Sequence, residues 1–194
     1  MTLIQALPIG KNKLKVLFEI YAEGEDYLRN VEKKTGINPS LIHRILKSLK
    51  EAEVISKKFR GKEAYYSFTK EGKCQFADFL ELFHLEMAAE RAKEIKTFLN
   101  LLLSSKRVVP LCKKIYLFGS FAFGEVKEGS DIDVLFVTNN RKEIMAWCQE
   151  TSLVLGRDIS PLIYTTSKFR SDLKKKEPLL NSIVNNIRNR VIIK

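Results

Sequence analysis

The sequence is poor in the residues from which disulfide frameworks and zinc sites are built. Its 194 residues include three cysteines and two histidines. Cys74, Cys112 and Cys148 are scattered and form no CxxC pair, so neither a disulfide framework nor a zinc site is expected. With only His43 and His84 present, a histidine-based metal cluster is nearly excluded. This cysteine usage favours a reducing compartment, and we predict a cytoplasmic protein.

Long apolar runs are also missing. No run approaches the roughly 20 residues that a membrane-spanning helix needs, so we predict no contact with a membrane. The N-terminal stretch MTLIQALPIGKNK has no charged leader and no small-residue cleavage pattern, and we interpret it as mature sequence rather than a signal peptide. The apolar fraction of 45% is ordinary for a protein with a buried core. The length allows one domain or two small ones.

Positive charge is plentiful. The formal net charge is +11, which suggests a polyanionic partner such as nucleic acid or a nucleotide phosphate. A solvated, lysine-rich surface is the plainer explanation, and charge alone leaves both open.

The N-terminal third predicts three helices and a hairpin. Apolar residues recur at helical spacing over residues 11–22, and a second short helix is expected over residues 25–36, where Gly36 stops it. A third helix begins after Asn38, which can cap it, with Pro39 in the first helical position. Two strands follow around a basic turn at residues 60–63.

This third helix has a polar face opposite its apolar stripe. The segment NPSLIHRILKSLKEAEVISKKFRGKEAYYSFTKEGK resembles the recognition helix and wing of winged helix-turn-helix transcription regulators of the multiple-antibiotic-resistance and arsenic-resistance type. The resemblance implies binding to double-stranded DNA, with the helix in the major groove and the wing on nearby phosphates. A winged helix used for protein contact is the alternative. The predicted DNA-binding residues are Ser40, His43, Arg44, Lys47, Lys57, Lys58, Arg60 and Lys62.

A long helical segment is expected over about residues 70–105. Its apolar stripe suits the dimer interface that such regulators commonly use, or it packs against a second domain, with His84 as a packing residue. We predict an α+β protein with a winged helix over residues 1–73, a connecting or dimerisation helix over 74–105, and a second domain over 106–194. A homodimer is expected.

The second domain contains the pattern GSFAFGEVKEGSDIDVLFV. Asp131 and Asp133 lie one residue apart beside an apolar strand, and alternation places both on one face. Two neighbouring carboxylates in such a place repel each other and lose hydration, and a divalent cation such as Mg²⁺ or Mn²⁺ relieves both costs. Gly119 and Ser120, at the end of the preceding strand, suit phosphate binding. Solvent-facing aspartates without a ligand are the weaker alternative.

The full pattern, Gly-Ser-x10-Asp-x-Asp, resembles the nucleotidyltransferase superfamily typified by DNA polymerase β, and most of all its minimal branch. The resemblance implies a mixed sheet flanked by helices and two-metal transfer of a nucleotidyl group. Asp131 and Asp133 would hold the metal, and Gly119 and Ser120 the β and γ phosphates. In that family a third carboxylate on the next strand completes the site. Asp158 is the candidate here, although it also suits a strand-entry cap or an ion pair with Arg157.

Three functions remain open from the sequence. The leading one is a DNA-binding nucleotidyltransferase that transfers AMP from ATP to a hydroxyl acceptor. The resemblance further implies an autoregulating antitoxin with a helical toxin as partner. The second is a non-catalytic regulator whose C-terminal domain senses nucleotide or dimerises. Small-molecule modification of the aminoglycoside type ranks third. The basic residue that would neutralise the triphosphate is not fixed by the sequence, and the candidates are Lys127, Arg157, Lys168 and Arg170.

Overall fold

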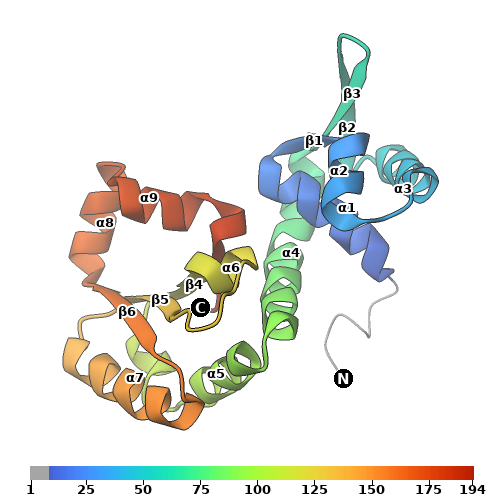
Figure 1. Cartoon of the computed structure of the whole chain (residues 1–194). Helices are drawn as coiled ribbons and strands as arrows, with labels where there is room; N and C mark the ends of the chain where they lie inside the picture. The colour runs from blue at the N-terminus through green and yellow to red at the C-terminus, as the bar shows by residue number, and fades with distance from the viewer. Residues whose placement is uncertain (1–8) are drawn as a thin grey trace. The chain divides into compact units, whose positions relative to one another are not determined.

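A computed structural model describes residues 9–194 (Figure 1). Residues 1–8, the start of the predicted 1–73 domain, lie outside the described residues. The chain divides into two compact units, one ending at His84 and one beginning at Leu85. Each unit buries apolar side chains of its own.

The first unit is a helical core with a projecting hairpin. Its short three-stranded sheet is antiparallel, in the order β1-β3-β2, and the β2–β3 hairpin extends away from the three helices (Figure 1). This arrangement is a winged helix, as the sequence predicts. Its elements are α1 (Lys11–Glu23), β1 (Glu25–Tyr27), α2 (Leu28–Thr35), α3 (Pro39–Glu51), β2 (Ile55–Arg60), β3 (Glu63–Phe68) and the start of α4 (Lys70–Arg91).

Helix α3 begins where the sequence indicates. The Asn38 side chain accepts a hydrogen bond from the Ser40 backbone N–H at 2.9 Å, and Pro39 occupies the first turn. Ile42, Leu46 and Leu49 form the buried stripe, each at most 1% exposed. Burying that stripe leaves the polar face of α3 in solvent.

The segment predicted as one helix over 25–36 is a strand followed by a helix. Asp26 is buried, and its Oδ1 accepts hydrogen bonds from the Tyr27 backbone N–H and from Asn30 Nδ2, both at 2.8 Å. Lys34 Nζ donates to the other carboxylate oxygen at 3.2 Å. These bonds hold Asp26 within β1, which pairs with β3. Helix α2 therefore begins only at Leu28.

The second unit is built on a mixed sheet of four strands in the order β6-β5-β4-β7. Strands β5 and β6 are parallel, and the other pairs are antiparallel. Strand β6 lies at an edge, as the presence of Pro161 predicts. The elements are α5 (Lys93–Leu103), η2 (Val109–Leu111), β4 (Lys114–Phe118), α6 (Gly119–Phe123), β5 (Ile132–Val137), α7 (Arg141–Leu155), β6 (Ile159–Tyr164), α8 (Thr166–Lys174), α9 (Pro178–Asn185), η3 (Ile187–Asn189) and β7 (Arg190–Ile192).

Helices cover both faces of this sheet. Phe98 of α5 and Trp147 of α7 pack with Val134 and Phe136 on one face. Phe169 of α8, with Leu180 and Ile183 of α9, packs with Tyr116 and Leu135 on the other face. Figure 1 shows the strands between these two helix pairs. The mixed sheet flanked by helices is confirmed.

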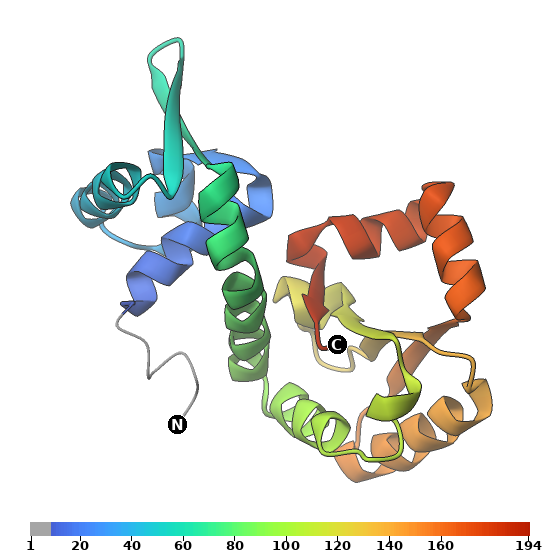
Figure 2. The same cartoon turned by 180° about the vertical axis from the view of Figure 1, so that it is seen from behind.

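Two features of the chain differ from the sequence-based prediction. The helical segment 70–105 is two helices, α4 and α5, interrupted at Ala92. The sequence after β6 predicts two helical stretches up to Lys194, but strand β7 forms there and pairs with β4; Figure 2 shows it in red. Ile95, Phe98 and Leu102 of the predicted connecting helix belong to the core of the second unit. That part of the apolar stripe is therefore used for packing.

His84 is a packing residue, as expected. It is 1% exposed, and its ring lies 4.6 Å from that of Phe18, centroid to centroid. In the described part of the chain, no helix combines the length and the apolar character that a membrane span requires.

Candidate nucleotide site and nucleic-acid interface

The Gly-Ser turn and the aspartate pair meet at one end of the β4–β5 pair. Gly119 begins α6 directly after β4, with φ +70°. A Cβ atom at this position would collide with Oδ2 of Asp133 and stand 3.1 Å from its Cγ. Both the backbone conformation and the close approach therefore require glycine. The structure brings together the two halves of the motif that the sequence separates by ten residues.

The two aspartates differ in environment. Asp131 precedes β5 and is exposed, whereas Asp133 lies within β5 and is half-buried. Burial raises the pKa of the Asp133 carboxyl above its usual value, and the nearby Asp131 raises it further. The cation site predicted from the sequence stays a prediction; a bound divalent cation would offset both the burial of Asp133 and its repulsion from Asp131.

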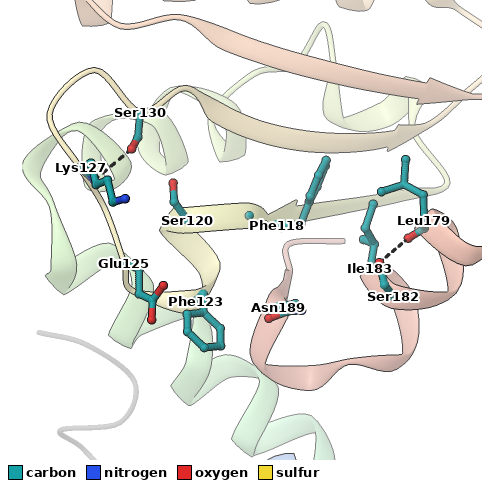
Figure 3. A pocket seen from close by; sticks show the side chains of 11 residues that line it. Phe118, Ser120, Phe123, Glu125, Lys127, Ser130, Leu179, Ser182, Ile183 and Asn189 are labelled. Carbon is teal, nitrogen blue, oxygen red and sulfur yellow. Dashed lines mark hydrogen bonds between the residues drawn. The ribbon is translucent and has the colours of Figure 1, made fainter.

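A pocket of about 520 Å³ opens beside the turn. Figure 3 shows side chains of α6 and the following loop on one side of it, and side chains of α9 on the other. The Lys127 backbone N–H donates to Ser130 Oγ at 3.0 Å, which fixes the loop. The residues that line the pocket are Phe118, Gly119, Ser120, Phe123, Glu125, Lys127, Ser130, Leu179, Ser182, Ile183 and Asn189. Sequence reasoning did not find the α9 residues, because no local pattern relates α9 to the turn.

The four candidate cations have different surroundings. Lys127 lines the pocket. Arg157 donates to the Ser130 carbonyl at 2.7 Å and to Glu94 at 3.3 Å, so it braces the loop before β5. Lys168 Nζ lies 5.4 Å from the Tyr164 ring centroid, and Arg170 is exposed on α8. Lys127 is therefore the best placed of the four to meet a phosphate in this pocket.

Asp158 lies apart from this pocket. It is exposed, its carbonyl oxygen accepts from the Ile132 N–H at 2.8 Å, and it lines a separate pocket of about 350 Å³ with residues of α7. The parallel register pairs Asp133 with Ser160 instead. Over residues 9–194, no three histidine, cysteine or carboxylate side chains gather as a metal site would require. A metal or base role for Asp158 stays a prediction.

The first unit presents the predicted DNA-binding residues on α3 and the hairpin. Ser40, His43, Arg44 and Lys47 are exposed along α3. On the hairpin, Lys58, Arg60 and Lys62 are exposed, and Lys57 is half-buried. Arg60 is already engaged, because it pairs with Glu25 and its guanidinium lies 4.9 Å from the Tyr65 ring centroid. Lys47 Nζ lies 3.9 Å from Glu51 in an exposed pair, which contributes little.

The structure thus defines a class of protein, a winged helix joined to a domain with a nucleotide-transfer motif. The family model described as nucleotidyltransferase domain matches residues 89–191. The chain belongs to this family. No curated protein sequence matches the chain.

Several solved structures are similar to the N-terminal region. BpsR of Bordetella bronchiseptica, whose structure concerns regulation of its DNA binding by 6-hydroxynicotinic acid, is 20% identical over 41% of this chain and 60% of its own, with a TM-score of 0.36. YusO of Bacillus subtilis is 19% identical over 44% of this chain and 62% of its own, with a TM-score of 0.37. AF1382 of Archaeoglobus fulgidus is 18% identical over 41% of this chain and 93% of its own, with a TM-score of 0.36. The chain thus spans about three fifths of BpsR and YusO. The winged-helix assignment rests on the element order and sheet of the first unit itself.

Proposed function

We propose that the second unit transfers a nucleotidyl group, AMP, from ATP to a hydroxyl acceptor. The observation that supports this most is the close approach of Gly119 to Asp133. It joins the turn suited to phosphate and the carboxylate pair in one site, beside a pocket of about 520 Å³. Pockets for small ligands commonly have volumes of roughly 300–1,000 Å³.

Each residue of the site has a proposed role. Asp131 and Asp133 would hold Mg²⁺ or Mn²⁺, since both offer only oxygen ligands. The cation, when bound, would stabilise the charge on the attacking and leaving oxygens. Gly119 and Ser120 would bind the β and γ phosphates, and Lys127 would neutralise them. Asp158 would complete the metal set if a movement of its segment brought it to the pair.

Label transfer tests this proposal. The purified chain, Mg²⁺, α-labelled ATP and a cell lysate should give a labelled acceptor. The label should be lost with EDTA and in Asp131→Ala and Asp133→Ala variants, because each change removes the cation or one of its ligands. Absence of transfer with all four nucleoside triphosphates, while nucleotide binding persists, would reject the enzyme.

The register between β5 and β6 favours a second candidate function. Ser160 stands next to Asp133, where a carboxylate would complete the family's metal set. A domain with two carboxylates could bind a nucleotide and its cation without transferring a nucleotidyl group. The chain would then be a nucleotide-responsive regulator. Calorimetric binding of ATP with Mg²⁺, together with negative label transfer, is the outcome that identifies it.

We also propose that the first unit binds double-stranded DNA. Its fold is a winged helix, and exposed donors and cations gather on α3 and the hairpin. This is the chemistry that base edges and phosphates require. A homodimer would present two such helices to two half-sites; sedimentation of the full chain with and without DNA tests that.

Replacing Arg44 and Lys47 together by alanine should weaken DNA binding. Removing one phosphate-binding cation lowers the slope of log affinity against log salt by about 0.9. The double variant should therefore bind the upstream region of its own gene less tightly, with a slope smaller by about one to two. Fluorescence anisotropy across salt concentrations measures both quantities. Lys142→Ala, an exposed change on α7, is the matched control, and unchanged affinity in the double variant would refute α3 as the DNA-contacting helix.

From the resemblance alone, we further propose an autoregulating antitoxin. The acceptor would then be a hydroxyl group on a helical toxin partner, and the winged helix would bind the operator of the shared genes. A toxin gene beside this one, and transfer of label to its product, would support this role.

A further inference from the structure

An apolar side chain stands near the tip of the β2–β3 hairpin. Phe59 is 68% exposed and pairs with Ala64 across the hairpin. Residues 55–68 contain four basic residues and one acidic residue. The exposed ring therefore stands in a strongly cationic segment, and the core of the first unit does not bury it.

The ring lies on one defined face of the hairpin. Because Lys57 pairs with Tyr66 and Phe59 with Ala64, alternation places these four residues on the same face. Lys57 Nζ stands 4.7 Å from the Phe59 ring centroid and 5.8 Å from that of Tyr66. A cation at this distance from an aromatic ring is attracted to the face of the ring. The Lys57 ammonium group and the Phe59 ring are therefore held next to each other.

This face also borders a pocket of about 490 Å³ between the hairpin and the helices. Arg29 at the start of α2, His43 of α3, and Lys57 and Lys62 of the hairpin line it. Glu63 is the one acidic residue in the lining, and the Tyr65 hydroxyl donates to its carboxylate at 3.3 Å. A concave surface with cations from α2 and the hairpin, and a histidine from α3, matches a sugar-phosphate backbone.

We propose that Phe59 is an apolar wedge that enters the minor groove of bound DNA, while the adjoining pocket holds phosphates of the neighbouring strand. The proposal rests on DNA binding by the first unit and adds a residue and a consequence to it. Apolar side chains inserted at a base step partly unstack it and kink the duplex. Lys57, held over the ring, would lie close to the phosphates that flank such a step. We therefore expect the chain to bend its DNA.

The test uses the full chain and a duplex of about 30 base pairs of mixed sequence, long enough to report a bend, with a donor and an acceptor dye at its ends. Wild-type protein should raise energy transfer between the ends, which reports bending. Phe59→Ala should bind the duplex about tenfold less tightly at every salt concentration, because the loss of one aromatic contact with a base has an effect of this size. Its salt slope should match wild type, because no charge is removed. Energy transfer in its complex should fall to that of free DNA.

Two variants serve as controls, and a third separates charge from shape. Phe59→Leu keeps an apolar wedge and should retain most of the bend. Leu153→Ala removes an 86% exposed side chain from the second unit and should behave as wild type. Lys58→Ala should reduce the salt slope by about one and keep the bend, since it removes a phosphate contact alone.

Two results would overturn the wedge. One is a Phe59→Ala protein that binds and bends like wild type, which would leave the DNA-binding role of the first unit intact. The other is a Phe59→Ala protein with a lower salt slope, because the ring would then act only by positioning Lys57. Failure of the wild-type protein to bind any duplex is a separate result, which rejects DNA binding itself and the wedge with it.

Discussion

Replacing Gly119 by alanine should greatly weaken nucleotide binding. The added Cβ would collide with Asp133 Oδ2, and the backbone at φ +70° disfavours any side chain. The conformation alone costs about 1–2 kcal/mol of unfolding free energy, and the collision adds to that cost or displaces the carboxylate. Either outcome damages the phosphate turn and the metal pair together. We expect calorimetric affinity for ATP with Mg²⁺ to fall by about a hundredfold or more, equivalent to the removal of two charge-assisted hydrogen bonds.

Gly129→Ala is the matched control. Gly129 also has a positive φ, +81°, but an added Cβ would meet no atom within 4 Å. Both variants should therefore lose similar stability from backbone strain, as measured by denaturant unfolding. Only Gly119→Ala should also lose nucleotide binding. Equal loss of binding in both variants would show that general destabilisation, rather than the collision with Asp133, explains the effect.

The sequence predicts the residues of this site better than their contacts. Spacing and alternation are local properties, so they are enough to select Gly119, Ser120, Asp131 and Asp133 as candidates. The meeting of Gly119 with Asp133 depends on the antiparallel register of β4 and β5, in which Leu117 pairs with Val134. The α9 side of the pocket depends on packing of Leu180 and Ile183 against the sheet, which no local pattern encodes.

Elements that depend on tertiary partners are the ones the sequence misses. Strands β1 and β7 have three residues each, and each exists through pairing with a strand distant in the chain. The buried Asp26, with its hydrogen bonds to Tyr27 and Asn30, replaces the first turn of a helix that propensity favours. The boundary between the two units falls inside α4, where the helical pattern shows no break. Ala88 of α4 already belongs to the core that contains Ile95 of α5.

The place of Asp158 shows another limit of sequence reasoning. A strand that begins near an aspartate invites its assignment as the third ligand. Which residue lies beside Asp133 depends on the register of β5 and β6. Asp158 and Ser160 share one face of the strand, so a shift of two residues would exchange them. The structure places Ser160 there, so the sequence alone could not decide between two nearby candidates.

Asp133→Asn should raise the stability of the metal-free protein while greatly reducing nucleotidyl transfer. Burial and Asp131 both raise the pKa of Asp133, so its ionised form costs more in the folded than in the unfolded chain. The sign follows from proton linkage: this cost is absent below the unfolded pKa of about 3.9 and grows as pH rises through the folded pKa. The variant should therefore gain stability at neutral pH, by less than about 1 kcal/mol because the carboxylate still meets solvent.

Function should change in the opposite direction. Loss of a metal ligand removes several kcal/mol of transition-state stabilisation, so label transfer should fall by about a hundredfold to a thousandfold. Asp131→Asn is the matched control, because Asp131 is exposed. It should lose transfer similarly but gain less stability. Thermal unfolding between about pH 4 and pH 8 measures the stability of each protein, first in EDTA and then in Mg²⁺ with ATP. This window begins near the pKa of a carboxyl group in an unfolded chain.

Comparing EDTA with Mg²⁺ and ATP shows whether Asp133 is a metal ligand or only a residue whose charge destabilises the fold. If Asp133 holds the cation, Mg²⁺ with ATP should raise the unfolding temperature of the wild type far more than that of the Asn variant, since only binding to the folded state stabilises it. Equal stabilisation of both proteins would remove Asp133 from the metal site. The same experiment on Asp158→Asn and Ser160→Asp then addresses the third ligand. Stabilisation lost in Asp158→Asn would assign the third ligand to Asp158, whereas stabilisation gained in Ser160→Asp would mean that the natural site has only two carboxylates.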